Sequence, residues 1–323
     1  MSVTVWYGMT SVPSDLAGCV VTVGVFDGVH RGHRALIEAA VRRARELGVP
    51  AVMCTFDPHP ISVFLPDKAP TQLTSLDERV RLAGELGVDD VLVVNFTHEL
   101  AGLDARHYFR SLICDVLRAR AVFVGENFTF GRDAAGTSQT LRELGDEYGV
   151  EVEVVDLVHD GGRRLCSSLV REYLAAGDVA GADWVLGRDF SVTAKIVHGA
   201  GRGGAQLGYP TANQYFPESM ALPADGVYAG WLTVVDEGPV DGDMEPGVRY
   251  PAAISVGTNP TFGEDPRSVE SFVIGRDADL YGHTARVEFV AHLRDRVKFN
   301  GVDELLEAMG RDVERARELL GAD

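Results

Sequence analysis

The sequence predicts an α/β domain with a parallel sheet, followed by a small antiparallel β-barrel with a terminal α-helix. With 323 residues and 46% hydrophobic content, the chain is long enough for two ordinary cores. From residue 18 to about 157, apolar runs alternate with stretches of helical period, as in a parallel sheet covered by helices. After about residue 188, period-two segments alternate with Gly, Pro and Asp turns. We therefore expect domains at 1–187 and 188–323.

Five short apolar runs are predicted as the strands of the parallel sheet. They are mostly continuous and rich in Val, as expected when both faces of a strand are buried. The runs are 19–26, 51–56, 91–96, 121–124 and 152–158.

Helices are expected between these strands. Ser75 with Glu78 three residues later makes a capping box, and Asp104 can cap a helix that runs through Leu117. Two short helices, 168–176 and 179–186, close this half of the chain.

The second half is predicted to form a barrel with a helix packed on it. Its period-two segments are 190–198, 227–235, 250–256, 269–274 and 285–293. The segment 302–320 has a helical period and should pack against the barrel through one apolar face. That face consists of Leu305, Leu306, Met309, Val313, Ala316, Leu319 and Leu320.

Composition limits the partners. The chain carries 30 Lys and Arg against 48 Asp and Glu, a formal net charge of −18. Repulsion therefore opposes binding to nucleic acid or to anionic lipid, and we expect neither partner. Any phosphate must be held locally, by backbone amides, helix N-termini, a few cations and a divalent metal, for which Mg²⁺ is the expected ion.

Cysteine usage and targeting signals suggest a soluble, cytoplasmic protein. Cys19, Cys54, Cys114 and Cys166 stand singly with no CxxC pair, and we expect reduced thiols. The N-terminus has no basic segment followed by an apolar stretch, and no apolar run approaches the roughly 18 residues of a membrane span. The sequence leaves the oligomeric state open.

The sharpest motif is GVFDGVHRGH at 24–33, between the first strand and the first helix. In an open parallel sheet, ligands bind beyond the carboxyl ends of the strands, where this segment would lie. Its glycines allow the backbone to approach a nucleotide, and His30 and His33 can both face phosphates near a helix N-terminus. A single His here would more often be a satisfied polar residue, but two in this glycine frame favour the phosphate role.

The spacing of His30 and His33 resembles the HxGH signature of the nucleotidylyltransferase superfamily, and the longer string resembles its FAD synthetase branch. This resemblance implies a Rossmann-like nucleotidylyltransferase fold. It also implies catalytic roles for the two histidines. By the same resemblance, ATP would be bound at Gly24, Phe26, Asp27 and Gly28.

Three further segments follow in that family's order: TFDPHP at 55–60, VGENFTFGRDAAGT at 124–137 and CSSLVREYLAAGDVAGADWVLGR at 166–188. By resemblance, Asn127 would contact the flavin or adenine. The ATP phosphates would be held by Ser167, Ser168 and Arg171. Hydroxyls and amides at a helix start with a nearby cation do make an anion site, although simple N-capping is the alternative for the serines.

Some details depart from that pattern or stay open. The family usually shows SSTRIR where this chain has CSSLVR, so Cys166 replaces a Ser, Ser168 a Thr and Leu169 an Arg. Three polar residues lie in a Pro-rich loop after the second strand: Asp57, His59 and Lys68. They could line the flavin entry, but a structural or solvated role is equally open for each.

The second motif is HGAGRGGAQLGYPTAN at 198–213, at the start of the barrel. Its glycines, among them Gly201 and Gly203, suggest a loop that covers phosphates. Thr211 and Asn213 carry oxygen atoms that can ligate Mg²⁺ and orient ATP. PTAN closely resembles the signature of riboflavin kinases.

Other segments resemble the kinase family in order: LPADGVYAGWL at 222–232, ISVGTNPTFG at 254–263, SVESFVIG at 268–275 and DLYG at 279–282. Glu270, inside an apolar strand, is the expected base, because partial desolvation makes a carboxylate more basic. A Glu in a strand more often faces solvent, and only the motif favours the catalytic role.

Together these segments resemble the bifunctional riboflavin kinase/FMN adenylyltransferase family of bacteria. That resemblance implies the phosphorylation of riboflavin to FMN and the adenylylation of FMN to FAD, with riboflavin, FMN and ATP as substrates. One alternative is a nucleotidylyltransferase for another phosphorylated small molecule, which the barrel half disfavours. The other is a flavin-binding protein that has lost catalysis.

Overall fold

The computed structural model describes residues 3–198, 209–258, 267–299 and 301–322. The chain forms two compact units, Met1–Ser167 and Ser168–Asp323. Helix α8 (Val179–Leu186) packs on strands of the second unit. Both α8 and α7 (Ser167–Ala175) precede residue 188, where we expected the second domain to begin. The predicted domain boundary at 187 and 188 stays a prediction.

The sheet of the first unit is entirely parallel, as predicted. Its strand order is β1-β4-β3-β2-β5-β8. The strands are β1 (Thr4–Tyr7), β2 (Cys19–Val23), β3 (Ala51–Asp57), β4 (Asp90–Asn95), β5 (Ala119–Gly125) and β8 (Glu151–Val155). The edge strand β1 was not predicted, since it has only four residues.

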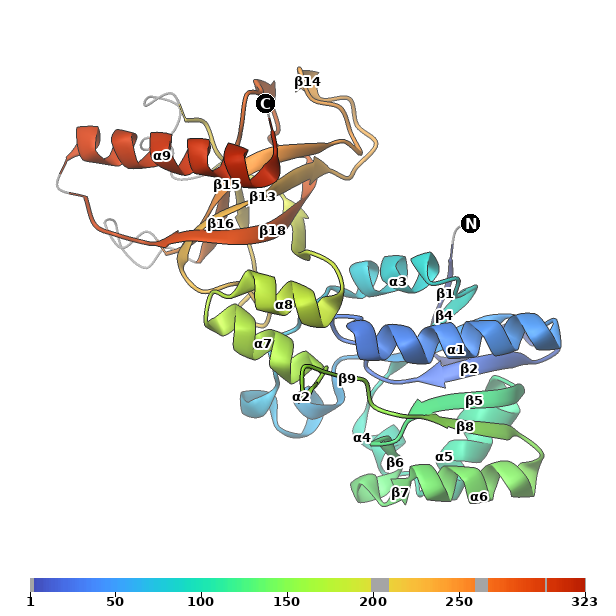
Figure 1. Ribbon diagram of the computed structural model, residues 1–323. Coiled ribbons are helices and arrows are strands. Elements are labelled where there is room, and N and C mark those ends of the chain that lie inside the picture. Colours follow the sequence, from blue (N-terminus) through green and yellow to red (C-terminus); the bar gives the residue numbers. More distant parts are fainter. Residues whose placement is uncertain (1–2, 199–208, 259–266, 300, 323) are drawn as a thin grey trace. The chain divides into compact units, whose positions relative to one another are not determined.

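Helices cover both faces of this sheet (Figure 1). Along β2, Val20 faces a core closed by α1 (Arg31–Leu47) and α3 (Leu76–Glu85), whereas Val21 faces the opposite core. The opposite core is closed by α5 (Ala105–Tyr108), the π-helix η3 (Phe109–Val116) and α6 (Ser138–Tyr148). This arrangement is the Rossmann-like α/β architecture expected from the sequence.

The predicted helix starts are confirmed. Ser75 Oγ accepts from the Glu78 backbone N–H at 3.2 Å, and Asp104 Oδ1 accepts from that of His107 at 2.9 Å. The capping box is incomplete, because the Glu78 carboxylate pairs with Arg81. The predicted helix to residue 117 is confirmed, with α5 (Ala105–Tyr108) continuing as the π-helix η3 (Phe109–Val116), whose C-cap is Leu117.

The chain changes direction across the sheet next to β2. From β2 it proceeds through β3 to β4 on one side, and β5 and β8 then lie on the other side. Ligands of open α/β sheets bind at such a switch point, outside the carboxyl ends of the strands. The predicted strand 19–26 is wrong at its end, because β2 stops at Val23 and Phe26 adopts a φ of 53°.

The second unit is an antiparallel sheet in the order β11-β18-β13-β15-β16-β12. A bridge between Val197 and Asn213 nearly closes it into the predicted barrel. The strands are β11 (Phe190–Lys195), β12 (Ala212–Tyr215), β13 (Gly226–Val234), β15 (Arg249–Gly257), β16 (Ser268–Val273) and β18 (Thr284–Asp295).

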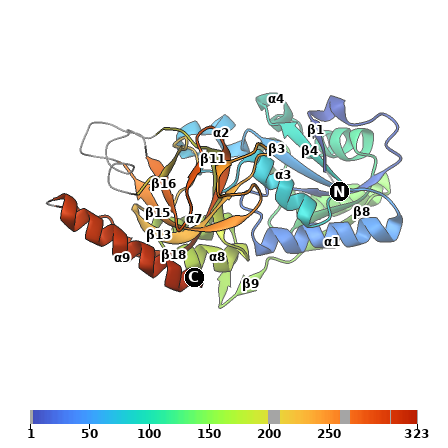
Figure 2. The same cartoon turned by 90° about the horizontal axis from the view of Figure 1, so that it is seen from above.

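The predicted terminal helix is confirmed as α9 (Val302–Leu320), which lies along the outside of the barrel in both views (Figure 1, Figure 2). Its residues Val313 and Ala316 pack against Ala253 and Phe272 on the outer face of the sheet. The Arg294 guanidinium on β18 also binds the buried Asp312 carboxylate of α9 through two nitrogens, at 2.7 to 3.1 Å.

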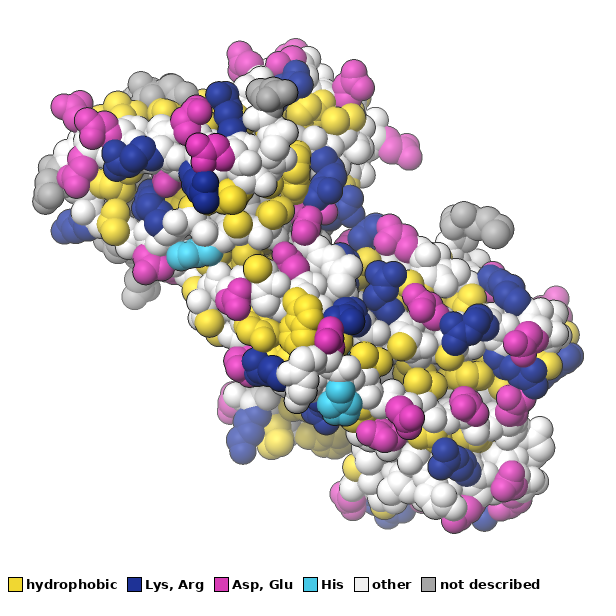
Figure 3. Space-filling view, in the orientation of Figure 1, with side chains coloured by type: hydrophobic (Ala, Val, Ile, Leu, Met, Phe, Trp, Pro, Cys, Tyr) yellow, Lys and Arg dark blue, Asp and Glu magenta, His cyan; other side chains and the backbone are white. Residues whose placement is uncertain are grey.

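Short elements complete the chain. The helices among them are η1 (Met9–Ser11), α2 (Pro60–Phe64), η2 (Pro66–Lys68), α4 (His98–Ala101) and η4 (Arg132–Ala134). The strands are β6 (Thr129–Phe130), β7 (Gly136–Thr137), β9 (His159–Asp160), β10 (Arg163–Arg164), β14 (Asp241–Gly242) and β17 (Ala278–Asp279). On the face shown in Figure 3, acidic and basic side chains are interspersed.

A fully buried amide ties together the two edges of the barrel. Gln214 is 0% exposed, and its Nε2 donates to the carbonyl of Ala194 on β11 at 2.6 Å and to that of Ala285 on β18 at 2.8 Å. Because β11 and β12 are the two edges of the sheet, this side chain fixes the short strand that carries Asn213.

Replacing Gln214 by Leu should therefore destabilise the second unit. The two carbonyls would lose a buried donor, which typically costs about 1 to 3 kcal/mol in the free energy of unfolding. Denaturant unfolding of the full chain measures this loss. Ser271→Ala is the control, since that buried hydroxyl has no hydrogen-bond partner in the described part of the chain. An equal loss in both variants would contradict the role given to Gln214.

Candidate functional site

The turn 24–33 begins where β2 ends and leads into α1. Phe26, Gly28 and Val29 all adopt positive φ, of 53°, 82° and 39°. A side chain on Gly24 would bring its Cβ to 3.1 Å from the buried Phe26 ring, so the ring would have to shift by a few tenths of an ångström to admit it. The predicted nucleotide loop is thus a tight turn at the carboxyl edge of the sheet.

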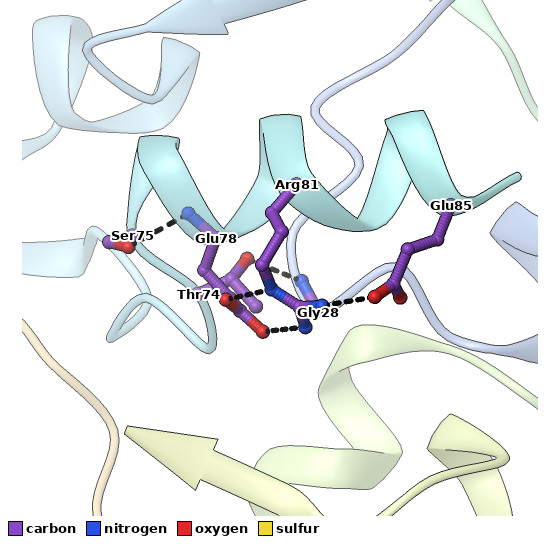
Figure 4. A network of polar contacts seen from close by, with 6 residues as sticks. All are labelled: Gly28, Thr74, Ser75, Glu78, Arg81 and Glu85. Carbon is purple, nitrogen blue, oxygen red and sulfur yellow. Dashed lines mark hydrogen bonds and ion pairs between the residues drawn. The ribbon is translucent and has the colours of Figure 1, made fainter. Parts of the chain in front are cut away.

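Asp27 holds this turn from within. The side chain is 3% exposed, and its carboxylate accepts from the backbone N–H groups of Leu73 and Thr74 at 2.9 and 3.1 Å. The Gly28 N–H in turn donates to Thr74 Oγ1 at 3.1 Å, just before α3 begins (Figure 4). Asp27, predicted to bind ATP, therefore links the turn to the start of α3.

The two histidines lie against each other at the start of α1. His30 is the N-cap residue, and its Nδ1 accepts from the His33 N–H at 3.3 Å. The rings stack with centroids 3.6 Å apart, and the Phe26 ring meets that of His33 edge-on at 5.3 Å. The structure thus brings both predicted catalytic histidines together at a helix N-terminus.

His33 is held in its neutral form. Burial, and then the nearby His30 and Arg79, lower the pKa of His33 well below its usual 6.5. Its Nδ1 is buried with no hydrogen-bond partner among the described residues. A neutral imidazole can act on an anion as an N–H donor but carries no charge.

The start of α7 is connected to the turn through Ser167. Its Oγ donates to the Asp27 carbonyl oxygen at 2.9 Å. Ser168 and Arg171 follow on α7, within the second compact unit. Leu169, at the position where an Arg was expected, is buried with Val170.

The three predicted flavin residues are exposed. Asp57 ends β3, and Asn127 lies in the turn after β5, so both stand at the carboxyl edge of the same sheet as the turn 24–33. Lys68 ends the short helix η2 in the loop after β3.

The second predicted site forms on the outer face of the barrel. Asn213 lies directly opposite Glu270 in the β12–β16 ladder, so the two side chains share one face. Ser255 lies opposite Glu270 on its other side. Glu270 is half-buried, and Ser268 Oγ donates to its Oε1 at 3.1 Å. Residues far apart in the sequence thus form one constellation.

Asn213 is oriented by its own amide. Its Nδ2 donates to the Thr211 carbonyl at 2.8 Å and to Thr211 Oγ1 at 3.3 Å. No described residue donates to its Oδ1, so this carbonyl oxygen and the Thr211 hydroxyl are hard oxygen donors of the kind that Mg²⁺ accepts. The residues present fit a magnesium ion shared with phosphates. Gly201 and Gly203 lie outside the described residues.

Sequence reasoning missed Arg79, which is buried beneath the turn 24–33. Its Nη1 donates to Thr55 Oγ1 at 3.0 Å, next to the strand end that carries Asp57. The sequence offered one signal for its burial. Arg79 lies in α3 at a position where the helical period turns a side chain toward the sheet.

Three comparisons bear on these two sites. The family model described as FAD synthetase matches residues 12–169, and the one described as riboflavin kinase matches residues 186–320. A bifunctional riboflavin kinase/FMN adenylyltransferase of Escherichia coli strain K12 is 34% identical, covering 98% of this chain and 96% of its own. A protein of the same name from Pseudomonas fluorescens is 36% identical, covering 97% and 96%.

A solved structure is also similar over its full length. It is described as a macrolide-efflux protein from Streptococcus pneumoniae, with a TM-score of 0.83, 29% sequence identity, and coverage of 98% of this chain and 99% of that one. In the described part of this chain, no helix has the length and apolar character needed to cross a bilayer.

The lowered pKa of His33 predicts a pH effect on stability. The unfolded chain binds a proton at His33 as the pH falls through about 6.5, whereas the folded chain does not until lower pH. The free energy of unfolding should therefore fall below pH 6.5, by at most about 1.4 kcal/mol per pH unit from this residue.

Melting curves between pH 7.5 and 5 test this effect. His33→Gln removes the titrating group, so its melting temperature should fall less over that range than the wild-type value. The same pH dependence in both proteins would show that His33 is not held neutral.

Proposed function

Because the chain belongs to the bifunctional riboflavin kinase/FMN adenylyltransferase family, we propose which of its residues perform the two reactions. The enzyme phosphorylates riboflavin to FMN with ATP, and it joins FMN to the adenylyl group of a second ATP to give FAD. We assign adenylylation to residues 1–187 and the kinase reaction to residues 188–323. The observation that carries the assignment is the pairing of the two histidines on one turn and of Asn213 with Glu270 on one sheet face.

In adenylylation, a phosphate oxygen of FMN attacks the α-phosphorus of ATP. The bond from that phosphorus to the bridging oxygen breaks, and pyrophosphate leaves with the electron pair. The transfer is direct, so no protein nucleophile is required. His33, being neutral, stabilises the developing negative charge by N–H donation, together with His30 and the positive end of the α1 dipole.

The other predicted residues bind the substrates of this reaction. Gly24, Phe26 and Gly28 shape the turn around the nucleotide, and Asp27 keeps it in place. The hydroxyl and cationic groups of α7 hold the β- and γ-phosphates: Ser167, Ser168 and Arg171. The flavin side is formed by Asn127, Asp57 and Lys68, which are exposed at or near the carboxyl edge of the sheet.

In the kinase reaction, Glu270 takes the proton of the riboflavin 5′-hydroxyl. The resulting oxygen attacks the γ-phosphorus of ATP in line, and ADP leaves. Ser268 holds the Glu270 carboxylate by a hydrogen bond, and Asn213 is fixed on the neighbouring strand. Gly201 and Gly203 are proposed to cover the ATP phosphates.

We propose Mg²⁺ as the metal of the kinase site, with Thr211 Oγ1 and Asn213 Oδ1 as its protein ligands. When bound, the ion neutralises charge on the ATP phosphates as the transfer proceeds. A cytoplasmic location is proposed as well, because both reactions consume ATP.

His30→Ala and His33→Ala should each lower FAD formation from FMN by roughly 10² to 10³. That is the usual loss when one donor to a transition state is removed. Formation of FMN from riboflavin should be unchanged, because it uses the other site. Chromatographic time courses of riboflavin, FMN and FAD measure both rates, and an equal fall in the two would overturn the assignment of residues.

Glu270→Gln should stop riboflavin phosphorylation while added FMN is still converted to FAD. Gln keeps the size of the side chain and one carbonyl oxygen but cannot accept a proton. The loss in kcat should be about 10² to 10⁴, with little change in the KM for ATP. The FMN-to-FAD rate is the control for folding. If the variant phosphorylates riboflavin at a near-normal rate, Glu270 is a structural residue and the base lies elsewhere.

A further inference from the structure

Arg79 is a buried cation connected to the turn that bears the two histidines. It is 4% exposed, and its Nη1 donates to Thr55 Oγ1 at 3.0 Å. The Thr55 hydroxyl donates in turn to the carbonyl of Val25 at 3.0 Å, immediately before Phe26. A chain of two hydrogen bonds therefore runs from α3 through β3 to the turn 24–33.

The Arg79 guanidinium makes no ion pair within the part of the chain that the structure describes. Among the described residues, no carboxylate lies within 4.0 Å of its guanidinium, and its Nε is buried without a hydrogen-bond partner. Burial lowers the pKa of Arg79, while the more distant charges of Asp27 and Asp57 act in the opposite direction. The Asp27 carboxylate is already occupied by the backbone N–H groups of Leu73 and Thr74.

Arg81, two residues further along α3, shows the contrast. It is half-exposed and pairs with Glu78 at 2.6 Å and with Glu85, as Figure 4 shows. The exposed cation of α3 is therefore paired with two carboxylates, whereas its buried cation has no ion pair among the described residues. Because a buried charge is unfavourable unless it is paired, a compensating anion is expected beside Arg79.

We propose that Arg79 is a positioning residue of FAD formation, whose fixed positive charge favours the phosphate chain of the nucleotide at the turn 24–33 and whose hydrogen bond to Thr55 keeps that turn in place. This inference rests on the proposed role of the turn as the phosphate site. A charge in a poorly hydrated interior acts over several ångströms with little screening, so direct contact with the phosphate is not required. The same charge helps to keep His33 neutral.

The test compares variants of the full-length chain that keep or remove this charge. Arg79→Met removes the charge, Arg79→Lys keeps it, and Arg81→Met is the matched control on the same helix. The affinity for inorganic pyrophosphate is measured by calorimetry. The kcat and KM for ATP are measured in the conversion of FMN to FAD, and the phosphorylation of riboflavin is measured in parallel.

Arg79→Met should weaken pyrophosphate binding and raise the KM for ATP by about 10- to 100-fold, the order expected when one poorly screened charge is lost. Arg79→Lys should stay within about threefold of the wild type because the charge is restored. Arg81→Met should not differ from the wild type, and riboflavin phosphorylation should be equal in all four proteins.

Other outcomes overturn the proposal. It fails if Arg79→Met binds pyrophosphate as the wild type does, or if Arg79→Lys loses as much as Arg79→Met. Should Arg79→Met unfold, Arg79→Gln repeats the test with a polar neutral side chain. If both neutral variants unfold while Arg79→Lys behaves normally, the charge serves the fold and not the ligand. A wild-type chain that fails to bind pyrophosphate would instead contradict the turn as the phosphate site.

Discussion

The hydrogen bonds of Asp27 are the constraint on which the N-terminal site depends. The turn has three positive φ angles, and besides a backbone hydrogen bond from Val29 N–H to the Phe26 carbonyl, side chains hold its geometry. The Asp27 carboxylate binds the backbone before α3, and the Asp27 carbonyl accepts from Ser167 at the start of α7. Within the first unit, one residue therefore connects the turn that begins α1 to the segment before α3 and to Ser167.

In the barrel, Gln214 is the side chain that holds the backbone near the proposed site. Asn213 stands on a four-residue edge strand, which pairs with β16 and, through one bridge, with Val197. The buried Gln214 amide next to it reaches two strands on the opposite edge of the sheet. In both halves, a buried polar side chain next to a proposed site residue fixes the backbone that carries it.

The periodic spacing of apolar residues along the sequence predicted much of this architecture. Continuous Val-rich runs indicated the parallel sheet, and the apolar face of α9 gave its bounds. What depends on long-range contact was not predictable. The end of β2 is set by the turn beyond it, and β12 exists as a strand because β16 pairs with it. The resemblance to a family indicated Asn213 and Glu270 separately, but their direct pairing across two strands required the fold, as did the burial of Arg79.

The electrostatics of the N-terminal site follow from the composition. A chain with a net charge of −18 repels polyphosphates at long range, so attraction must arise within a few ångströms of the turn. His33 supplies no charge there, since burial and its neighbours keep it neutral. The helix amides and the buried guanidinium of Arg79 remain as positive groups. In the proposed reaction, these groups are already in place before the substrate binds. They would not have to reorganise as charge moves onto the leaving pyrophosphate, and groups placed in this way stabilise a transition state more than a ground state.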